Sequence, residues 1–161
     1  MCEQIETEGK PVTDQKSSGR CWIFAMLNCM RIPVMKQLKL EDLEFSQNFI
    51  FFWDKVERLH YLLRVFVETA RRGESPDGRL VQHLLSNPSN DGGQWQMLVN
   101  LVNKYGVVPK KCFSEAWSSE NSRRLCIITN NKVCVCVCVC VWFHLEQPQM
   151  ALGDHKWFCM T

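Results

Sequence analysis

The stretch QKSSGRCWIFAMLN, residues 15–28, decides the fold of this 161-residue chain. From Cys21 to about Arg31 the sequence is apolar on nearly every side, which predicts a helix buried in a core. Serine and glycine at residues 17–19 favour a break in the backbone just before it. Pro33 is predicted to end or kink the helix. The sequence therefore places Cys21 in the first turn of a buried helix.

A cysteine in the first turn of a helix is well placed for nucleophilic chemistry. Only the thiolate attacks a carbonyl, and the N–H groups and dipole of a helix N-terminus favour negative charge. Acyl transfer also needs donors where the tetrahedral oxyanion forms, and the candidates are the backbone N–H of Cys21 and the side-chain amide of Gln15. The alternative is that Cys21 is a small core residue, as most cysteines on apolar helices are. Cys29 is assigned to that role.

Composition restricts the classes of function. The net charge is +2 and no basic block exceeds a pair, so neither nucleic acid nor an anionic membrane is expected as a partner. The polar N-terminus has no apolar core of a signal peptide, and the longest nearly apolar run, residues 133–143, is too short to span a bilayer. These features predict a cytoplasmic location. The ten cysteines are then expected to stay free thiols.

The rest of the chain predicts a helical layer. Apolar residues recur at steps of three and four over residues 41–72, with Ser46 as the predicted cap. Shorter helices are predicted at 79–87 and 94–106. The domain division that we predict is an extended lead-in at 1–20, a helical part at 21–125 and an irregular or disordered tail at 126–161.

The repeat VCVCVCVCV, residues 133–141, has three interpretations. As a strand, it would place four thiols on one face. As a metal site, its thiolates would suit zinc or copper(I), although zinc sites normally space their cysteines as C-x₂₋₄-C. As a translated GT dinucleotide repeat, it would read Val-Cys in frame and would never have been selected for folding. We favour the third interpretation, which makes the tail a read-through of non-coding sequence.

The segment QKSSGRCW resembles the nucleophile segment of papain-like cysteine peptidases, in which the glutamine lines the oxyanion hole and the cysteine attacks the carbonyl. The resemblance is closest to the bleomycin hydrolase family of thiol aminopeptidases and runs from about Glu8 to Arg124. It is carried by these stretches: EGKPVTDQKSSGRCWIF, FSQNFIFFWDKVER and DGRLVQHLLSNPSNDGGQWQMLVNLVNKYGVVPKKCF. Ser18 departs from the secreted papain-like members, which carry a disulfide-bonded cysteine there.

The resemblance implies an α+β papain-like fold, with Cys21 and Gln15 as catalytic residues. It also implies a substrate wall at Asn90, Gly92 and Gly93, where glycine lets a peptide backbone approach closely. A plain turn is the alternative for these glycines. The family acts without a metal or cofactor on peptides with a free N-terminus, and forms ring-shaped hexamers whose C-termini lie in the clefts.

The same resemblance requires a catalytic histidine and an asparagine that orients it, both from a sheet-rich half. The four histidines stand in other contexts, and GDHKWF around His155 does not match the family's histidine segment. We therefore expect a truncated member, mainly the helical half, that is impaired or inactive alone. Two alternatives remain open: a fragment that binds or poisons full-length hexamers, and a metal binder that uses Cys134 to Cys140.

Overall fold

The computed structural model describes residues 13–75, 77–86 and 89–145 of the chain, with side chains as far as residue 136. Six helices make up the described part: α1 (Cys21–Leu38), α2 (Gln47–Arg71), α3 (Arg79–Ser86), α4 (Trp95–Tyr105), α5 (Trp117–Glu120) and α6 (Ser122–Leu145). The described ranges form no strand, only two isolated bridges between Ser17 and Asn121 and between Phe45 and Pro109. The predicted helical character is confirmed for these residues, and the absence of the sheet-rich half stays a prediction.

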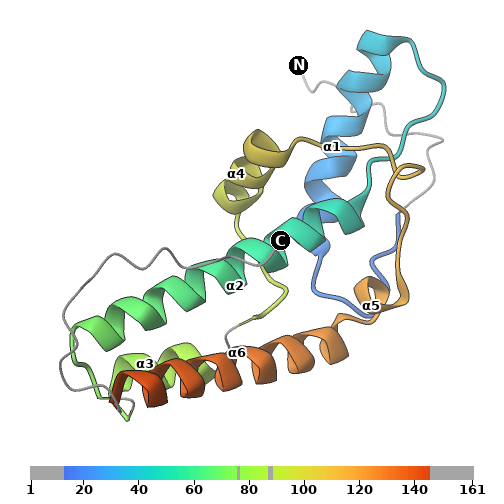
Figure 1. The fold of residues 1–161 in the computed structure, drawn as a ribbon. Helices are drawn as coiled ribbons and strands as arrows, with labels where there is room; N and C mark the ends of the chain where they lie inside the picture. Colours follow the sequence, from blue (N-terminus) through green and yellow to red (C-terminus); the bar gives the residue numbers. More distant parts are fainter. Residues whose placement is uncertain (1–12, 76, 87–88, 146–161) are drawn as a thin grey trace.

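The long helix α2 is the centre of the arrangement, with α1 and α4 packed near its start and α6 running beside it (Figure 1). Two clusters of buried side chains hold these helices together. The first joins α1, α2 and α4 and contains Ile23, Leu27, Phe45, Ile50, Phe51, Leu98 and Leu101. The second joins α2, α3 and α6 through Leu62, Phe66, Val81 and Val133. Burial of these apolar side chains, rather than local propensity, supplies most of the stabilisation of such helices.

Local signals in the sequence set several helix ends. Ser46 caps α2, as predicted, because its Oγ accepts a hydrogen bond from the backbone N–H of Phe49 at 3.1 Å. Gly106 ends α4 with a positive φ of 74°, which favours glycine. The start of α1 at Cys21 is also where the sequence places it.

Two predictions about the helices need correction. Pro33 does not end α1, which continues to Leu38, so that only the alternative of a kink stays a prediction. The irregular structure expected from residue 126 is replaced by α6 as far as Leu145, so the strand interpretation of the Val/Cys repeat is also wrong. In a helix, residues two apart do not face each other, so Cys134 and Cys136 do not share the face that a strand would give them. The metal interpretation stays untested, since the side chains of Cys138 and Cys140 lie outside the described residues.

None of the helices within the described ranges is long and apolar enough to cross a membrane. His144 and His155 lie outside the side chains that the structure describes, and so do residues 1–12 of the predicted lead-in. His60 and His83 are exposed on α2 and α3.

Candidate active site

The thiol of Cys21 is exposed at the first residue of α1. The carbonyl oxygen of Arg20 accepts hydrogen bonds from the N–H groups of Ile23 and Phe24, at 2.9 and 3.1 Å. The N–H of Cys21 lies ahead of these bonds and donates to no acceptor among the described residues. An exposed thiol and an unused backbone donor therefore meet at the positive end of a helix dipole.

The residue immediately before this thiol is one of the most deeply buried in the chain. The side chain of Arg20 is 0% exposed, and its Nη1 lies 2.7 Å from Oε2 of Glu115. Its Nε donates to Oγ of Ser18 at 2.8 Å, and its guanidinium lies over the rings of Phe24 and Phe51. A fully desolvated arginine needs such a complete set of partners. The position of Cys21 is therefore fixed by the anchoring of its neighbour.

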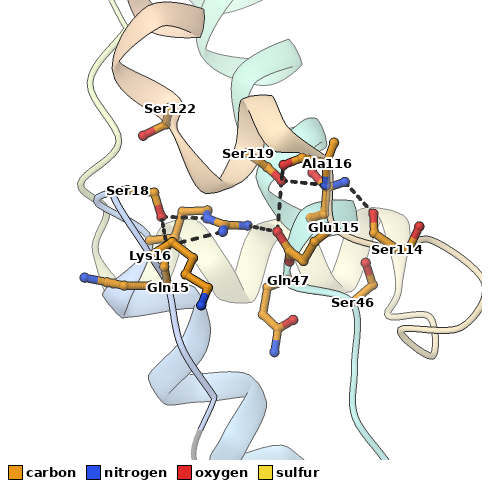
Figure 2. A network of polar contacts seen from close by, with 12 residues as sticks. Gln15, Lys16, Ser18, Ser46, Gln47, Ser114, Glu115, Ala116, Ser119 and Ser122 are labelled. Atoms are coloured by element: carbon orange, nitrogen blue, oxygen red, sulfur yellow. Dashed lines mark hydrogen bonds and ion pairs between the residues drawn. The ribbon is translucent and has the colours of Figure 1, made fainter.

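Figure 2 shows this network between two distant parts of the chain, with Glu115 and Ser119 on one side and Ser18 and Gln15 on the other. Ser119 donates to Oε2 of Glu115 at 2.9 Å, and so helps to hold the carboxylate that binds Arg20. Ser18 donates to the backbone oxygen of Gln15 at 2.6 Å. The side-chain oxygen of Gln15 is buried and has no hydrogen-bond partner in the described part of the chain. The structure thus places Gln15 and Cys21 on one short, well-anchored segment.

The predicted substrate wall belongs to residues 89–93, the wall loop, which contacts Trp22, the residue after Cys21. The indole Nε1 of Trp22 donates to the backbone oxygen of Asp91 at 2.8 Å. A Cβ built on Gly93 would lie 2.4 Å from Cε2 of Trp22, which is closer than non-bonded atoms can approach. Gly93 is therefore required by packing against Trp22, whereas Gly92 has open space around its Cα. The structure brings the residues of the predicted wall close to the nucleophile segment, and their role in binding a substrate stays a prediction.

Two cationic side chains of α2, Lys55 and Arg58, bind residues 90–92 of the wall loop. Lys55 donates to the backbone oxygen of Asn90 at 2.8 Å and forms an ion pair with Asp91 at 2.6 Å. Arg58 donates to Oδ1 of Asn90 at 3.0 Å and to the backbone oxygen of Gly92. The side-chain oxygen of Asn90 is therefore already used within the chain. Lys55 and Arg58 are three residues apart, which places both on one face of the helix.

Asp91 is the site residue that sequence reasoning missed. One carboxylate oxygen accepts from Lys55 and from the thiol of Cys126 at 3.0 Å, while the other accepts from the N–H of Gly19 at 3.3 Å and from the hydroxyl of Ser122. Burial alone would raise the pKa of Asp91, but the hydrogen bonds and the Lys55 charge outweigh it and lower this pKa to about 2. An ionised Asp91 therefore joins the nucleophile segment, the wall loop, α2 and α6.

Two groups near Asp91 have a raised pKa, because burial is not outweighed there. It raises the pKa of the Cys126 thiol, and the hydrogen bond to the Asp91 carboxylate raises it further. It also raises the pKa of Asp54, despite the ion pair with Arg58 at 2.9 Å. Cys126 is thus a poor nucleophile beside the exposed Cys21. Only the Cys21 thiol combines exposure with a helix N-terminus among the described cysteines.

No local pattern in the sequence distinguishes Asp91, Lys55 or Glu115 from ordinary surface charges. Their roles come from contacts between residues 36 to 95 positions apart, and a single sequence does not display such contacts. The spacing of Asp54, Lys55 and Arg58 places three charges on one face of α2, but it does not show which residues they contact. Within the described residues, no group of three or more histidine, cysteine or acidic side chains is arranged to hold a metal ion.

Comparison with known proteins places this geometry in a family. The model of the Peptidase C1-like family matches residues 2–137. The chain is 63% identical over 129 residues to bleomycin hydrolase of Oryctolagus cuniculus and 62% identical over 129 residues to that of Homo sapiens. It is 46% identical over 121 residues to "Cysteine proteinase 1, mitochondrial" of Saccharomyces cerevisiae (strain YJM789). The resemblance predicted from the sequence is confirmed.

A solved structure has the same fold. The crystal structure of pepw from Lactobacillus rhamnosis superposes with a TM-score of 0.78 at 42% identity and covers 84% of this chain. The chain spans only part of each of these proteins: 47% of the rabbit relative, 28% of the human one, 25% of the yeast one and 30% of the solved chain. A family match over residues 2–137, close relatives and a shared fold agree, and the chain belongs to the Peptidase C1-like family.

Proposed function

We propose that the chain supplies the nucleophile of a thiol-dependent aminopeptidase of the bleomycin hydrolase type. The thiolate of Cys21 attacks the carbonyl carbon of a peptide bond, and the amine leaves as the acyl group becomes a thioester. Water then hydrolyses the thioester and restores the thiol. The observation that carries the proposal is the exposed thiol of Cys21 beside its own unused N–H at the start of α1.

Gln15 is proposed as the second donor to the oxyanion. Its side-chain amide is neutral, so it stabilises the developing charge without taking up the thiol proton. The anchoring of residues 15–20 through Ser18 and Arg20 supports this role, because an oxyanion hole works only when its donors are fixed beforehand. Gly92 and the backbone of Asn90 are proposed to line the path of the peptide. The substrates are then peptides with a free N-terminus, and no cofactor takes part.

Turnover also needs a base for the thiol proton, and in the described part of the chain no hydrogen bond joins Cys21 to a histidine. We therefore propose that this chain alone turns over slowly or not at all. Hydrolysis of a fluorogenic aminoacyl amide by the purified chain and by its Cys21→Ala variant tests both parts of the proposal. Turnover that depends on Cys21 would support the chemistry and contradict the inactivity. If full-length relatives kept their activity after the equivalent cysteine was replaced, the chemistry itself would be refuted.

A binding role is the second candidate, favoured by an apolar stripe on the exposed face of α2. Phe52, Val56, Leu63 and Val67 recur along this helix and are between 37% and 48% exposed. A stripe of this kind suits an interface more than a free surface. Under this proposal the chain joins or blocks hexamers of a full-length cytoplasmic enzyme. Co-purification of tagged chain with the full-length enzyme would support it, and a Val56→Glu/Leu63→Glu variant that still co-purifies would refute this use of the stripe.

A further inference from the structure

The proposed oxyanion donor, Gln15, lies on a stretch of chain that is anchored on both sides. Before it, Nδ2 of Asn28 donates a hydrogen bond to the hydroxyl of Thr13 at 2.7 Å. Asn28 follows Cys21 by about two turns of α1, so the two residues lie on the same face of that helix. After it, the hydroxyl of Ser18 donates to the backbone oxygen of Gln15 at 2.6 Å. This stretch is therefore held along the face of α1 that carries the nucleophile.

The residue after Gln15 has a strained backbone. The φ of Lys16 is 54°, in the left-handed region that side chains disfavour. Among the described residues other than glycine, only Lys39 shares a positive φ, and Lys39 ends a helix. No helix ends at Lys16. Strain of this kind persists only where the surrounding structure imposes it, and it is concentrated at functional sites.

The side chain of Asp14 supports this conformation. Its Oδ1 accepts a hydrogen bond from the backbone N–H of Lys16 at 2.7 Å, and its Oδ2 lies 3.0 Å from Nζ of the same lysine. The backbone hydrogen bond is also the main cause of the lowered pKa of Asp14, so its carboxylate is ionised at neutral pH. The ion pair is exposed and contributes little by itself. The backbone hydrogen bond is the contact that bends the chain, and Gln15 is the residue inside the bend.

The amide of Gln15 is placed so that its donor end remains free. Its Oε1 is buried, whereas its Nε2 is not fully buried and donates to no acceptor in the part of the chain that the structure describes. The developing oxyanion needs an N–H donor, so this end of the amide is the one that the proposed reaction uses. Such a donor is effective only when it is held in place before the charge develops.

We propose that Asp14 is a positioning residue of the oxyanion hole. Its hydrogen bond to the N–H of Lys16 holds the bend that directs the Gln15 amide towards the carbonyl bound at Cys21. The inference rests on the proposed function and adds to it the residue that orients the donor. Asp14 itself contacts neither the substrate nor the reacting atoms, and acts through Gln15.

A peptide aldehyde with a free N-terminus tests this role without requiring turnover. The Cys21 sulfur forms a bond to the aldehyde carbon, the carbon–oxygen double bond becomes single, and the thiol proton is transferred to that oxygen. Nothing leaves, and the oxygen of this hemithioacetal takes the place of the oxyanion. NMR of an aldehyde labelled at its carbonyl carbon would give the dissociation constant. The rate at which iodoacetamide alkylates Cys21, read by mass spectrometry, would report the thiol alone, because that reaction forms no tetrahedral oxygen.

Gln15→Ala is expected to weaken aldehyde binding roughly tenfold, because it removes one hydrogen bond to the oxygen. Asp14→Ala is expected to produce most of the same loss. The double variant Asp14→Ala/Gln15→Ala should bind no more weakly than Gln15→Ala alone, because one residue acts through the other. All three variants should react with iodoacetamide at the unmodified rate, which a general loss of structure around Cys21 would change.

Two further variants should restore binding. Asp14→Asn keeps a side-chain oxygen that accepts from the Lys16 N–H. Lys16→Gly, added to Asp14→Ala, lets the backbone adopt the left-handed conformation without strain. Lys16→Met is the matched control, since it removes the exposed ion pair but keeps the backbone hydrogen bond, and it should bind like the unmodified chain. Weak binding in Asp14→Asn would refute the hydrogen bond as the cause.

Other results would overturn the inference in distinguishable ways. Full aldehyde binding in Asp14→Ala, with Gln15→Ala still weakened, would refute the role of Asp14 and leave the proposed function standing. Losses that multiply in the double variant would show that Asp14 acts independently of Gln15. Unchanged binding in Gln15→Ala, or no binding that depends on Cys21 in the unmodified chain, would refute the proposed oxyanion hole, and the role of Asp14 with it.

Discussion

Two neighbouring glycines of the wall loop have different reasons to be glycine. Gly93 lies under the ring of Trp22, so close that no Cβ fits, whereas Gly92 has no heavy atom within 4 Å of the place a Cβ would take. The sequence predicted that both glycines leave room for a substrate backbone. In the structure, the room at Gly93 is taken by the chain's own tryptophan, and only Gly92 remains free to serve a ligand.

The variant Gly93→Ala is expected to lower the free energy of unfolding by about 1–3 kcal/mol, because the new methyl group must displace the Trp22 ring. Gly92→Ala is expected to change it by less than about 0.5 kcal/mol, because the methyl group enters open space. Urea denaturation followed by circular dichroism would measure both. Equal losses in the two variants would contradict the packing of Trp22 on Gly93.

Asp91 gives the stability of the chain an acid dependence. Its pKa is about 2 in the folded chain and 3.8 ordinarily. Between these values the unfolded chain binds more protons than the folded one. The contribution of Asp91, about 2 kcal/mol, is therefore fully present above the unfolded pKa and is lost as the pH falls through the folded pKa.

The free energy of unfolding of the unmodified chain and of Asp91→Asn should therefore differ most at neutral pH and converge towards pH 2. Urea denaturation at a series of pH values between 2 and 7 measures this difference. The exposed Asp77→Asn serves as the control and should follow the unmodified chain throughout. Curves for Asp91→Asn and the unmodified chain that stay parallel would show that Asp91 is not the ionised centre described above.

At the scale of single elements, helix starts were easier to predict than helix ends. The starts of α1 and α2 have local signals, a serine- and glycine-rich break and a serine cap. Pro33 does not end α1, which was the first of its two predicted effects. A proline costs the helix one hydrogen bond to the carbonyl four residues earlier, which here belongs to the exposed Cys29 and is open to water. The burial of Met35 one turn later keeps the chain helical.

The helix α6 was missed for a similar reason. The Val/Cys alternation has the period of a strand, and only packing decides otherwise. Val133 is 5% exposed, in contact with Leu62, Phe66 and Val81 of two other helices, whereas Val135 is 60% exposed. A strand would have given both valines the same face. Tertiary contacts of this kind override local propensity and are not visible in one sequence.

The end of α1 offers a test of helix energetics. Lys39 ends the helix in the left-handed region with φ 53°, a conformation that disfavours side chains. Lys39→Gly should therefore raise the free energy of unfolding by about 0.5–1 kcal/mol. The same substitution at the exposed helical position Gln37 should lower it by about 1 kcal/mol.

Thermal unfolding of both variants measures the two effects, which are expected to have opposite signs. A loss of stability in Lys39→Gly would show that Lys39 does not take the left-handed conformation in solution.

At the scale of the whole molecule, the candidate site depends on contacts between distant segments. Gly19 meets Asp91 across 72 residues, Trp22 meets Asp91 across 69, and Arg20 meets Glu115 across 95. The sequence alone could place Cys21 at a helix start from local signals, and the resemblance to a family suggested the wall loop. It could not show that a buried ion pair anchors the nucleophile, because both partners look like surface charges.

Removal of one partner of that ion pair should be costly. Glu115→Ala leaves the fully buried guanidinium of Arg20 without its carboxylate, and a loss of about 3–5 kcal/mol is expected. Glu68→Ala breaks an exposed ion pair with Arg72 and should cost less than about 1 kcal/mol. Denaturant titration of both variants gives the comparison, and losses of similar size would mean that Arg20 is open to water.

The long reach of the Arg20 contact also has a consequence during protein synthesis. The ribosome makes the residues of α1 first, and Glu115 is added 95 residues after Arg20. Until then the nascent chain has no carboxylate to bury with this arginine, and residues 15–20 lack their anchor. The start of α1 therefore gains the Glu115 anchor of Arg20 only after most of the described part of the chain has been synthesised.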